Sequence, residues 1–161
     1  MFILAYKGVV WKLFSGRNFI YDDIITNYGG IITGEWQEYI QSKEETCGQA
    51  AMAFFLSNVG VDTSEDSIIE QSGTSSMLSL ADLERIALSY DFKTQLVRVK
   101  PAFFRNKPAA AILHFTGRHF IVFVQTINDE AVIFDPAYGQ VYVSWRILSK
   151  LFSGYMLYIY N

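Results

Sequence analysis

The spacing of hydrophobic positions changes near residue 92, from a pattern typical of helices to one typical of strands. In the first half, the run from Cys47 to Asn58 is apolar on nearly every side, which predicts a helix buried in the middle of a domain. Gly60 follows at the position of a C-terminal cap, because glycine readily adopts the left-handed backbone that ends many helices. A buried helix is therefore expected to begin at Cys47.

Two further helices are predicted over residues 64–71 and 80–90. Each begins near a serine or threonine that an aspartate follows three residues later, a spacing typical of a capping box. The pairs are Thr63 with Asp66 and Ser79 with Asp82. In the second helix apolar residues recur at helical spacing, which predicts one buried face. This stripe consists of Leu80, Leu83, Ala87 and Tyr90.

After Asp91, β-branched and aromatic residues dominate and predict strands. The expected strands cover residues 94–99, 109–115, 119–126, 131–134, 140–143 and 155–160, with one helix over 144–152. Turn-forming residues separate several strands, at 128–130 and 136–139. Helices followed by antiparallel strands predict an α+β fold of two layers, with N-terminal helices packed on a C-terminal antiparallel sheet.

Residues 1–40 show less pattern, and we interpret them as an N-terminal extension of a domain that covers residues 41–161. The start of the chain is apolar but contains lysines, so it fits either a strand or an arm that docks on a partner or a membrane. Asn27-Tyr-Gly29-Gly30 is a turn signal within this extension. No stretch of about eighteen apolar residues occurs, so no membrane-spanning helix is expected.

Composition narrows the classes of protein and of site. Apolar residues make up 51% of the chain and charged residues 18%, which argues against disorder. The net charge of -3 argues against a nucleic-acid partner, because such proteins concentrate positive charge. A single cysteine excludes an internal disulfide and a cysteine-rich zinc site, and we expect neither a metal nor an organic cofactor.

That single cysteine, Cys47, is the first candidate for chemistry. A lone cysteine is more often an inert buried residue than a reactive one. Here it opens a helix, where unpaired N–H groups and the helix dipole favour a thiolate. Gly48 follows directly and lacks a side chain, so a substrate backbone could approach closely. This context favours a nucleophile.

A cysteine nucleophile needs a base, and the chain has two histidines, His114 and His119. We favour His119, because it begins a strand that turns back through Asp135; His114 would then be structural or line a groove. Asp135 could orient the imidazole, although Asp-Pro is also a common turn. A strict two-residue turn at Asn128-Asp129 would put His119 and Asp135 on opposite faces of the sheet unless a bulge intervenes.

Gln41, six residues before Cys47, is a candidate for stabilising an oxyanion. Its side-chain amide could donate to the negative oxygen of a tetrahedral intermediate, beside the backbone N–H of Cys47. An exposed loop glutamine in a charged stretch is the alternative. The expected site therefore contains Cys47, His119, Asp135 and Gln41, with no metal ligand and no cofactor-binding residue.

The region from about Ile40 to Tyr160 resembles the double-glycine peptidases, papain-like cysteine peptidase domains found at the N-terminus of bacteriocin-exporting ABC transporters. The matching pieces are Gln41 with Thr46-Cys47-Gly48-Gln49-Ala50, the 73–92 region, 108–115, His119-Phe-Ile-Val and Phe134-Asp135-Pro136-Ala-Tyr-Gly139. The resemblance implies a papain-like fold with Cys47 as nucleophile, His119 as base, Asp135 as orienting group and Gln41 in the oxyanion hole.

The resemblance also implies cleavage after the Gly-Gly pair that ends the leader of a secreted peptide. Gly29-Gly30 of this chain loosely imitates the end of such a leader, with a simple turn as the alternative to self-cleavage. Family members often have Asp-Cys-Gly-Pro-Ala where this chain has Thr46-Cys47-Gly48-Gln49-Ala50. No membrane or ATPase segments follow, so we expect a free-standing form of the domain, which puts the coupling of cleavage to export in doubt.

Several alternatives stay open on the sequence alone. The domain could bind a leader without cutting it, or act as a papain-like acyl transferase or amidase, since water and amine acceptors use the same acyl-enzyme chemistry. The expected partners are a peptide or protein substrate and an ABC transporter or other export machinery. For location, the cytoplasm or the inner face of the membrane is favoured over the periplasm.

Overall fold

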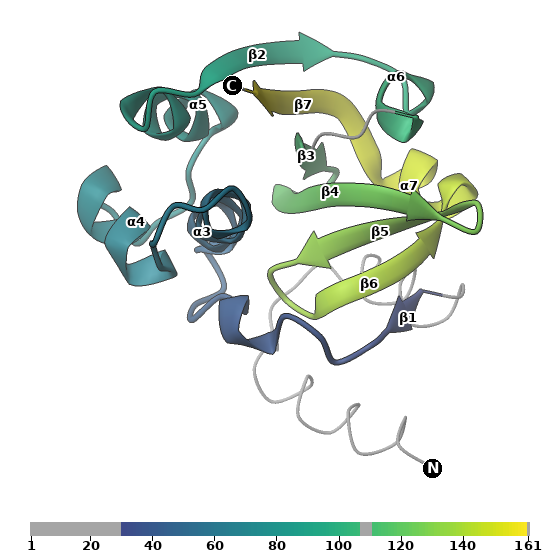
Figure 1. Cartoon of the computed structure of the whole chain (residues 1–161), viewed down its shortest axis with the longest axis horizontal. Helices are drawn as coiled ribbons and strands as arrows, with labels where there is room; N and C mark the ends of the chain where they lie inside the picture. The colour runs from purple at the N-terminus through teal and green to yellow at the C-terminus, as the bar shows by residue number, and fades with distance from the viewer. Residues whose placement is uncertain (1–29, 107–110, 161) are drawn as a thin grey trace.

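The structure, a computed structural model, describes residues 30–106 and 111–160 and is built around one seven-stranded antiparallel sheet (Figure 1). The order of strands across the sheet is β1-β6-β5-β4-β3-β7-β2. The strands are β1 (Ile31–Ile32), β2 (Lys93–Arg98), β3 (Ala111–Phe115), β4 (His119–Ile127), β5 (Glu130–Asp135), β6 (Gly139–Ser144) and β7 (Phe152–Tyr160). The sheet therefore places the start of β4 and the end of β5 next to each other.

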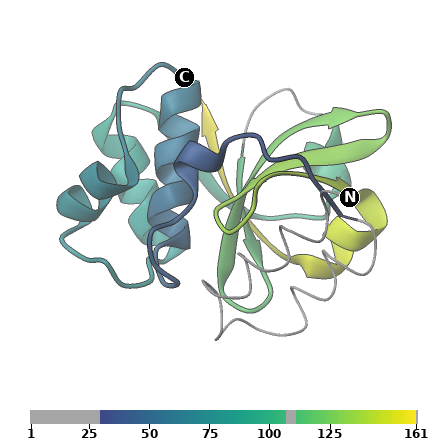
Figure 2. The same ribbon diagram turned by 90° about the horizontal axis from the view of Figure 1, so that it is seen from below.

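Helices lie on both faces of this sheet. On one side are α3 (Cys47–Asn58), α4 (Glu65–Ser72) and α5 (Leu80–Ser89), with α3 between α4 and the strands (Figures 1 and 2). On the other side are α6 (Ala102–Arg105) and α7 (Trp145–Leu151), and a single 3-10 turn, η1 (Gln37–Tyr39), precedes α3. The expected α+β architecture is confirmed, but α6 was not anticipated and the second helical side adds to the two layers expected.

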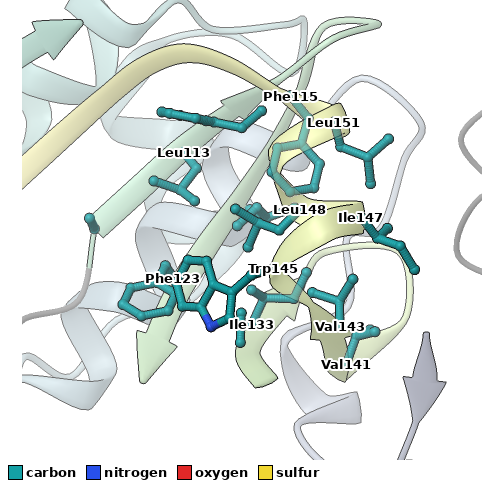
Figure 3. Close-up of a cluster of buried hydrophobic side chains, with 14 of the residues drawn as sticks. Leu113, Phe115, Phe123, Ile133, Val141, Val143, Trp145, Ile147, Leu148 and Leu151 are labelled. Carbon is teal, nitrogen blue, oxygen red and sulfur yellow. The ribbon is translucent and has the colours of Figure 1, made fainter. Parts of the chain in front are cut away.

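The hydrophobic core is correspondingly divided by the sheet into two clusters. In the first, residues of α6 and α7 pack on one face of the strands (Figure 3). The ring centroid of Trp145, for example, lies 5.6 Å from that of Phe123 and 5.8 Å from that of Phe104. In the second, α3 and α5 pack on the opposite face, where Phe54 of α3 stacks on Phe134 of β5 at 4.1 Å. Both faces of the sheet are thus buried, which fixes its side-chain alternation.

The helix boundaries follow their caps. α3 begins and ends as predicted, every residue from Cys47 to Leu56 is buried, and Gly60 adopts a positive φ just beyond its end. The capping box of Ser79 and Asp82 at α5 is present. At α4, however, the cap is Ser64, whose hydroxyl accepts from the backbone N–H of Ser67, so the prediction of a Thr63 cap was wrong by one residue. The adjacent serine offers the same hydroxyl in extended backbone.

The hairpin of β4 and β5 contains both features that the sequence left open. Its turn is the two-residue Asn128-Asp129, both with positive φ, and it places Ile127 opposite Glu130. The pairing then shifts by one residue at Val124, so that Phe123 lies opposite Ile133. This bulge reverses the alternation and brings the side chains at positions 119 and 135 to the same face of the sheet.

The segment that leads to α3 packs against the turn between β5 and β6. Ile31–Ile32 pairs with β6 as strand β1, and the Gln37 amide donates to the carbonyl of Tyr138 at 2.9 Å. Gly139, with φ +80°, leaves no room for a side chain here, because a Cβ would lie 2.4 Å from the carbonyl oxygen of Glu35. This contact anchors the residues before Cys47 to the loop that follows Asp135.

The first 29 residues lie outside the described part of the chain, and so do the predicted docking arm and one glycine of the Gly29-Gly30 pair. The predicted start of a strand at residue 109 also lies outside it. Among residues 30–106 and 111–160, none of the helices is long and apolar enough to cross a bilayer. The proposed boundary at residue 40 stays a prediction.

Candidate active site

Cys47 is the first residue of α3, at the helix end that faces the start of β4. Its thiol lies 3.9 Å from the carbonyl oxygen of Arg118, the residue immediately before His119. The preceding turn is closed by Thr46, whose hydroxyl donates to the carbonyl of Lys43 at 2.9 Å and accepts from the N–H of the same residue at 3.2 Å. A helix N-terminus is a position where backbone N–H groups and the helix dipole stabilise negative charge.

His119 and Asp135 form a buried pair. Nε2 of His119 lies 2.9 Å from Oδ1 of Asp135, and the two residues are 8% and 0% exposed. The same carboxylate oxygen accepts the backbone N–H of Ala137 at 2.8 Å, so the turn after β5 holds Asp135 in place. With Nε2 occupied by the carboxylate, Nδ1 remains for the sulfur. The bulge at Val124 is what makes this contact geometrically available.

The electrostatics of the pair favour a charged imidazole. Burial alone lowers the pKa of His119, but the charge and hydrogen bond of Asp135, followed by those of Cys47, outweigh it and raise the pKa to about 9. The Cys47 contribution means that sulfur and imidazole interact directly. At neutral pH His119 is therefore a charged imidazolium beside the sulfur of Cys47.

Gln41 lies in the turn that leads into α3 and is 5% exposed. Its backbone N–H donates to the carbonyl of Pro136 at 2.9 Å, which ties it to the loop after Asp135. Its side-chain nitrogen donates to the carbonyls of Lys43 at 2.6 Å and Glu44 at 3.0 Å, while its Oε1 is buried without a partner. Both amide protons are thus engaged within the turn, a feature that the sequence did not reveal.

A groove of about 270 Å³ begins beside the Cys47 and His119 pair. One wall comes from the loop before α5 and the start of that helix, and the other from the sheet. The lining residues are Met77, Leu78, Ser79, Leu80, His114, Arg118, Phe120 and Tyr155. Arg118 lines the groove and also contacts the sulfur of Cys47 through its carbonyl, so this residue links the groove to the sulfur.

His114 lines this groove rather than contacting Asp135. Its Nδ1 lies 2.8 Å from the hydroxyl of Ser153, and its ring lies 5.3 Å from that of Phe120. Burial, and then the positive charge of His119, hold the pKa of His114 below its usual value. A neutral imidazole in a mainly apolar groove can accept or donate one hydrogen bond without adding a charge.

Two features differ from the sequence interpretation. Gly48 is buried, and a Cβ there would lie 3.3 Å from Cβ of Leu78 and 3.4 Å from the ring of Phe120. Its lack of a side chain therefore serves the packing of α3 in this structure. Arg118 was not singled out, although its place in the turn before His119 was a usable signal; its φ of +64° aims a carbonyl at Cys47.

Residues 37–161 match the model of the peptidase C39 family. An uncharacterized protein of Methanothermobacter marburgensis is 27% identical over 149 residues, which cover 92% of this chain and 96% of that protein. The colicin V secretion/processing ATP-binding protein CvaB of Escherichia coli is 25% identical over 130 residues, which cover 78% of this chain. Those residues make up only 19% of CvaB, so the similarity concerns a small part of that protein.

Solved structures with similar folds are peptidase domains. A double glycine motif protease from an AMS/PCAT transporter, in complex with the leader peptide, gives a TM-score of 0.67 at 23% identity, over 74% of this chain and 87% of that one. The peptidase domain of Streptococcus ComA, a bi-functional ABC transporter, gives 0.70 at 18% identity, over 76% and 96%. These likenesses confirm the expected papain-like peptidase fold.

Proposed function

Because its residues 37–161 match the family model, the chain belongs to the peptidase C39 family, and on this premise we propose that it is a cysteine endopeptidase. Its substrate would be a precursor peptide with a leader that ends in Gly-Gly, and the cut would follow the second glycine. The observation that carries the proposal is the hydrogen-bonded pair of His119 and Asp135 beside Cys47 at a helix N-terminus. Leader binding by a structural relative supports the substrate class.

The mechanism follows from the geometry of these groups. The Cys47 thiolate attacks the carbonyl carbon of the second glycine, and the His119 imidazolium gives its proton to the leaving amine of the next residue. The neutral imidazole then takes a proton from water, which attacks the acyl-enzyme and releases the leader as a carboxylic acid. Asp135 keeps the ring oriented through Nε2 and stabilises its positive charge throughout.

The tetrahedral intermediates carry a negative oxygen near the start of α3. The backbone N–H of Cys47 is one donor for it, and the amide of Gln41 is the second. To take this role, Gln41 exchanges one of its bonds to the carbonyls of Lys43 and Glu44 for a bond to the oxyanion. The exchange is favourable because a hydrogen bond to a charged acceptor is stronger than one to a neutral carbonyl.

Access to the sulfur sets a condition on the reaction, since Cys47 is only 2% exposed. The groove continuous with Arg118 is the route by which a peptide would reach it. Its mostly apolar lining suits a peptide with an apolar side chain. An export partner such as an ABC transporter, the whole-protein context of CvaB and ComA, would deliver this peptide.

The experiment is cleavage of a synthetic peptide that contains Gly-Gly, under reducing conditions, followed by mass spectrometry. We expect a single cut after the second glycine by the wild type and by the control variant Ser57→Ala, and none by Cys47→Ala or after alkylation by iodoacetamide. A peptide that binds but stays intact would assign the domain to leader capture. A product joined to an added amine instead of water would assign it to acyl transfer.

A further inference from the structure

We propose that Gln49 is a positioning residue that determines which substrate side chain the groove beside Cys47 accepts, an inference that rests on the proposed peptidase function. Gln49 lies in the first turn of α3 and is fully buried. Its side-chain nitrogen donates two hydrogen bonds, to the carbonyl of Thr74 at 3.2 Å and to that of Ser76 at 2.8 Å. It therefore holds the loop between α4 and α5 against the helix that carries the nucleophile.

This loop forms one wall of the groove. Among the described residues, the side-chain hydrogen bonds that join positions 74–76 to α3 are those of Gln49. The next residues along the chain are Met77 and Leu78, which line the groove, and Leu78 also rests close to Gly48 on the helix. Because the carbonyl of Ser76 is held directly before Met77, the amide of Gln49 fixes the position of this wall.

The opposite wall comes from the sheet and from the turn before β4. It contains Phe120, which is 3% exposed, and Arg118, whose carbonyl contacts the sulfur. The width of the groove therefore depends on where Gln49 holds the loop relative to this wall. A space of about 270 Å³ with a mainly apolar lining fits one large apolar side chain, such as leucine or phenylalanine, upstream of the cleaved bond.

The bonding of Gln49 also makes the inference testable. Its Oε1 is buried and has no hydrogen-bond partner, which is unfavourable for the folded state. Gln49→Met has nearly the same length and volume but lacks both the donors and this unpaired acceptor. The loss of two bonds is partly offset by removal of the unpaired oxygen, so the variant is expected to fold while its loop is released.

The experiment compares the wild type, Gln49→Met and the matched control Gln71→Met, which changes an exposed glutamine of α4. The substrates are a Gly-Gly peptide and variants in which each of about six residues before the glycines is in turn alanine. In the wild type, alanine at one apolar position should lower kcat/KM by about 10- to 100-fold, the size expected for a side chain in an apolar pocket. Gln49→Met should reduce this discrimination at least about fivefold, through KM.

The rate of Cys47 alkylation by iodoacetamide separates this effect from general damage. We expect the alkylation rate to change by less than about twofold in Gln49→Met. The bonds of Gln49 to the loop do not involve the groups that determine the charge of the sulfur. The inference would be overturned if Gln49→Met discriminated between the peptides as the wild type does. It would also be overturned if kcat/KM fell equally for every peptide and alkylation slowed. In both cases the peptidase function would stand. A wild type that cleaves no peptide would instead remove the proposed function and this inference with it.

Discussion

Replacement of Asp135 by asparagine tests the charge of the His119 partner without changing the shape of the site. One oxygen of Asp135, Oδ1, accepts from both His119 Nε2 and the N–H of Ala137. The amide oxygen of asparagine can accept both bonds, so Asp135→Asn keeps the orientation of the ring and its Nε2–H. What the variant loses is the negative charge that stabilises the imidazolium.

The expected size of the effect follows from the pKa of His119. That pKa lies at about 9, compared with 6.5 for an ordinary histidine, a difference that corresponds to about 3 kcal/mol. Burial opposes the rise, and Asp135 is the leading group that reverses it. Without the carboxylate charge, burial dominates, and the pKa should fall to about 6.5 or below. At pH 7 the imidazolium fraction should then fall from nearly complete to about a quarter or less.

The assay is the rate of alkylation of Cys47 by iodoacetamide as a function of pH, with peptide cleavage measured in parallel. In the wild type the imidazolium should deprotonate near pH 9, which sets the basic limb of the cleavage profile. In Asp135→Asn this limb should move by about 2 pH units toward acid, and both rates at pH 7 should drop.

The matched control is Asp129→Asn, which alters an exposed aspartate in the turn of the same hairpin. It removes an ion pair with Arg105 but leaves the site intact, so its profile should match that of the wild type. If the basic limb of Asp135→Asn stayed near pH 9, the carboxylate would not be what charges the imidazole. The reasoning from the buried pair would then be refuted.

Three further outcomes are expected. Because the pKa of His119 is raised in the folded state, its proton stabilises the fold fully below about pH 6.5 and less as the pH rises through about 9. The urea midpoint of the wild type should therefore fall over that range, and that of Asp135→Asn should not. Gln41→Ala should lower kcat by about 100- to 1000-fold with little change in KM; a raised KM with unchanged kcat would show that Gln41 only shapes its turn. Gly139→Ala should lower the free energy of unfolding in urea by about 2–4 kcal/mol, because its Cβ would meet the Glu35 carbonyl. Gly60→Ala, whose Cβ would have no atom within 4 Å, should lower it by about 1 kcal/mol. Equal losses would contradict the close approach at Gly139.

The sequence predicted the secondary-structure elements that have strong local signals. The apolar run from Cys47 to Asn58 could only be buried as a helix, and the capping box at Ser79 fixed the start of α5. The cap of α4 moved from Thr63 to Ser64 because neighbouring hydroxyl residues give the same signal. The four-residue helix α6 lacked any periodicity long enough to reveal it, although Pro101 stands at its start.

The contact between His119 and Asp135 was predictable from the sequence, but other contacts of the site were not. Nothing local in the sequence shows that the amide of Gln41 turns back onto the carbonyls of Lys43 and Glu44, because those bonds depend on the shape of the whole turn. The clamp from Gln49 to the loop at Thr74 joins elements that are 25 residues apart. Such contacts depend on tertiary packing, so local sequence patterns do not predict them.

The one-residue shift at Val124 makes the length of a hairpin as important as the identity of its side chains. Deleting a single residue between His119 and Asp135 while the bulge stays in place would carry the imidazole and the carboxylate to opposite sides, whereas deleting Val124 itself would remove the bulge and keep them on one side. Paired deletions or insertions would preserve their facing. Homologous sequences that keep this facing should therefore vary here in even steps, or in odd steps that also remove or add a bulge.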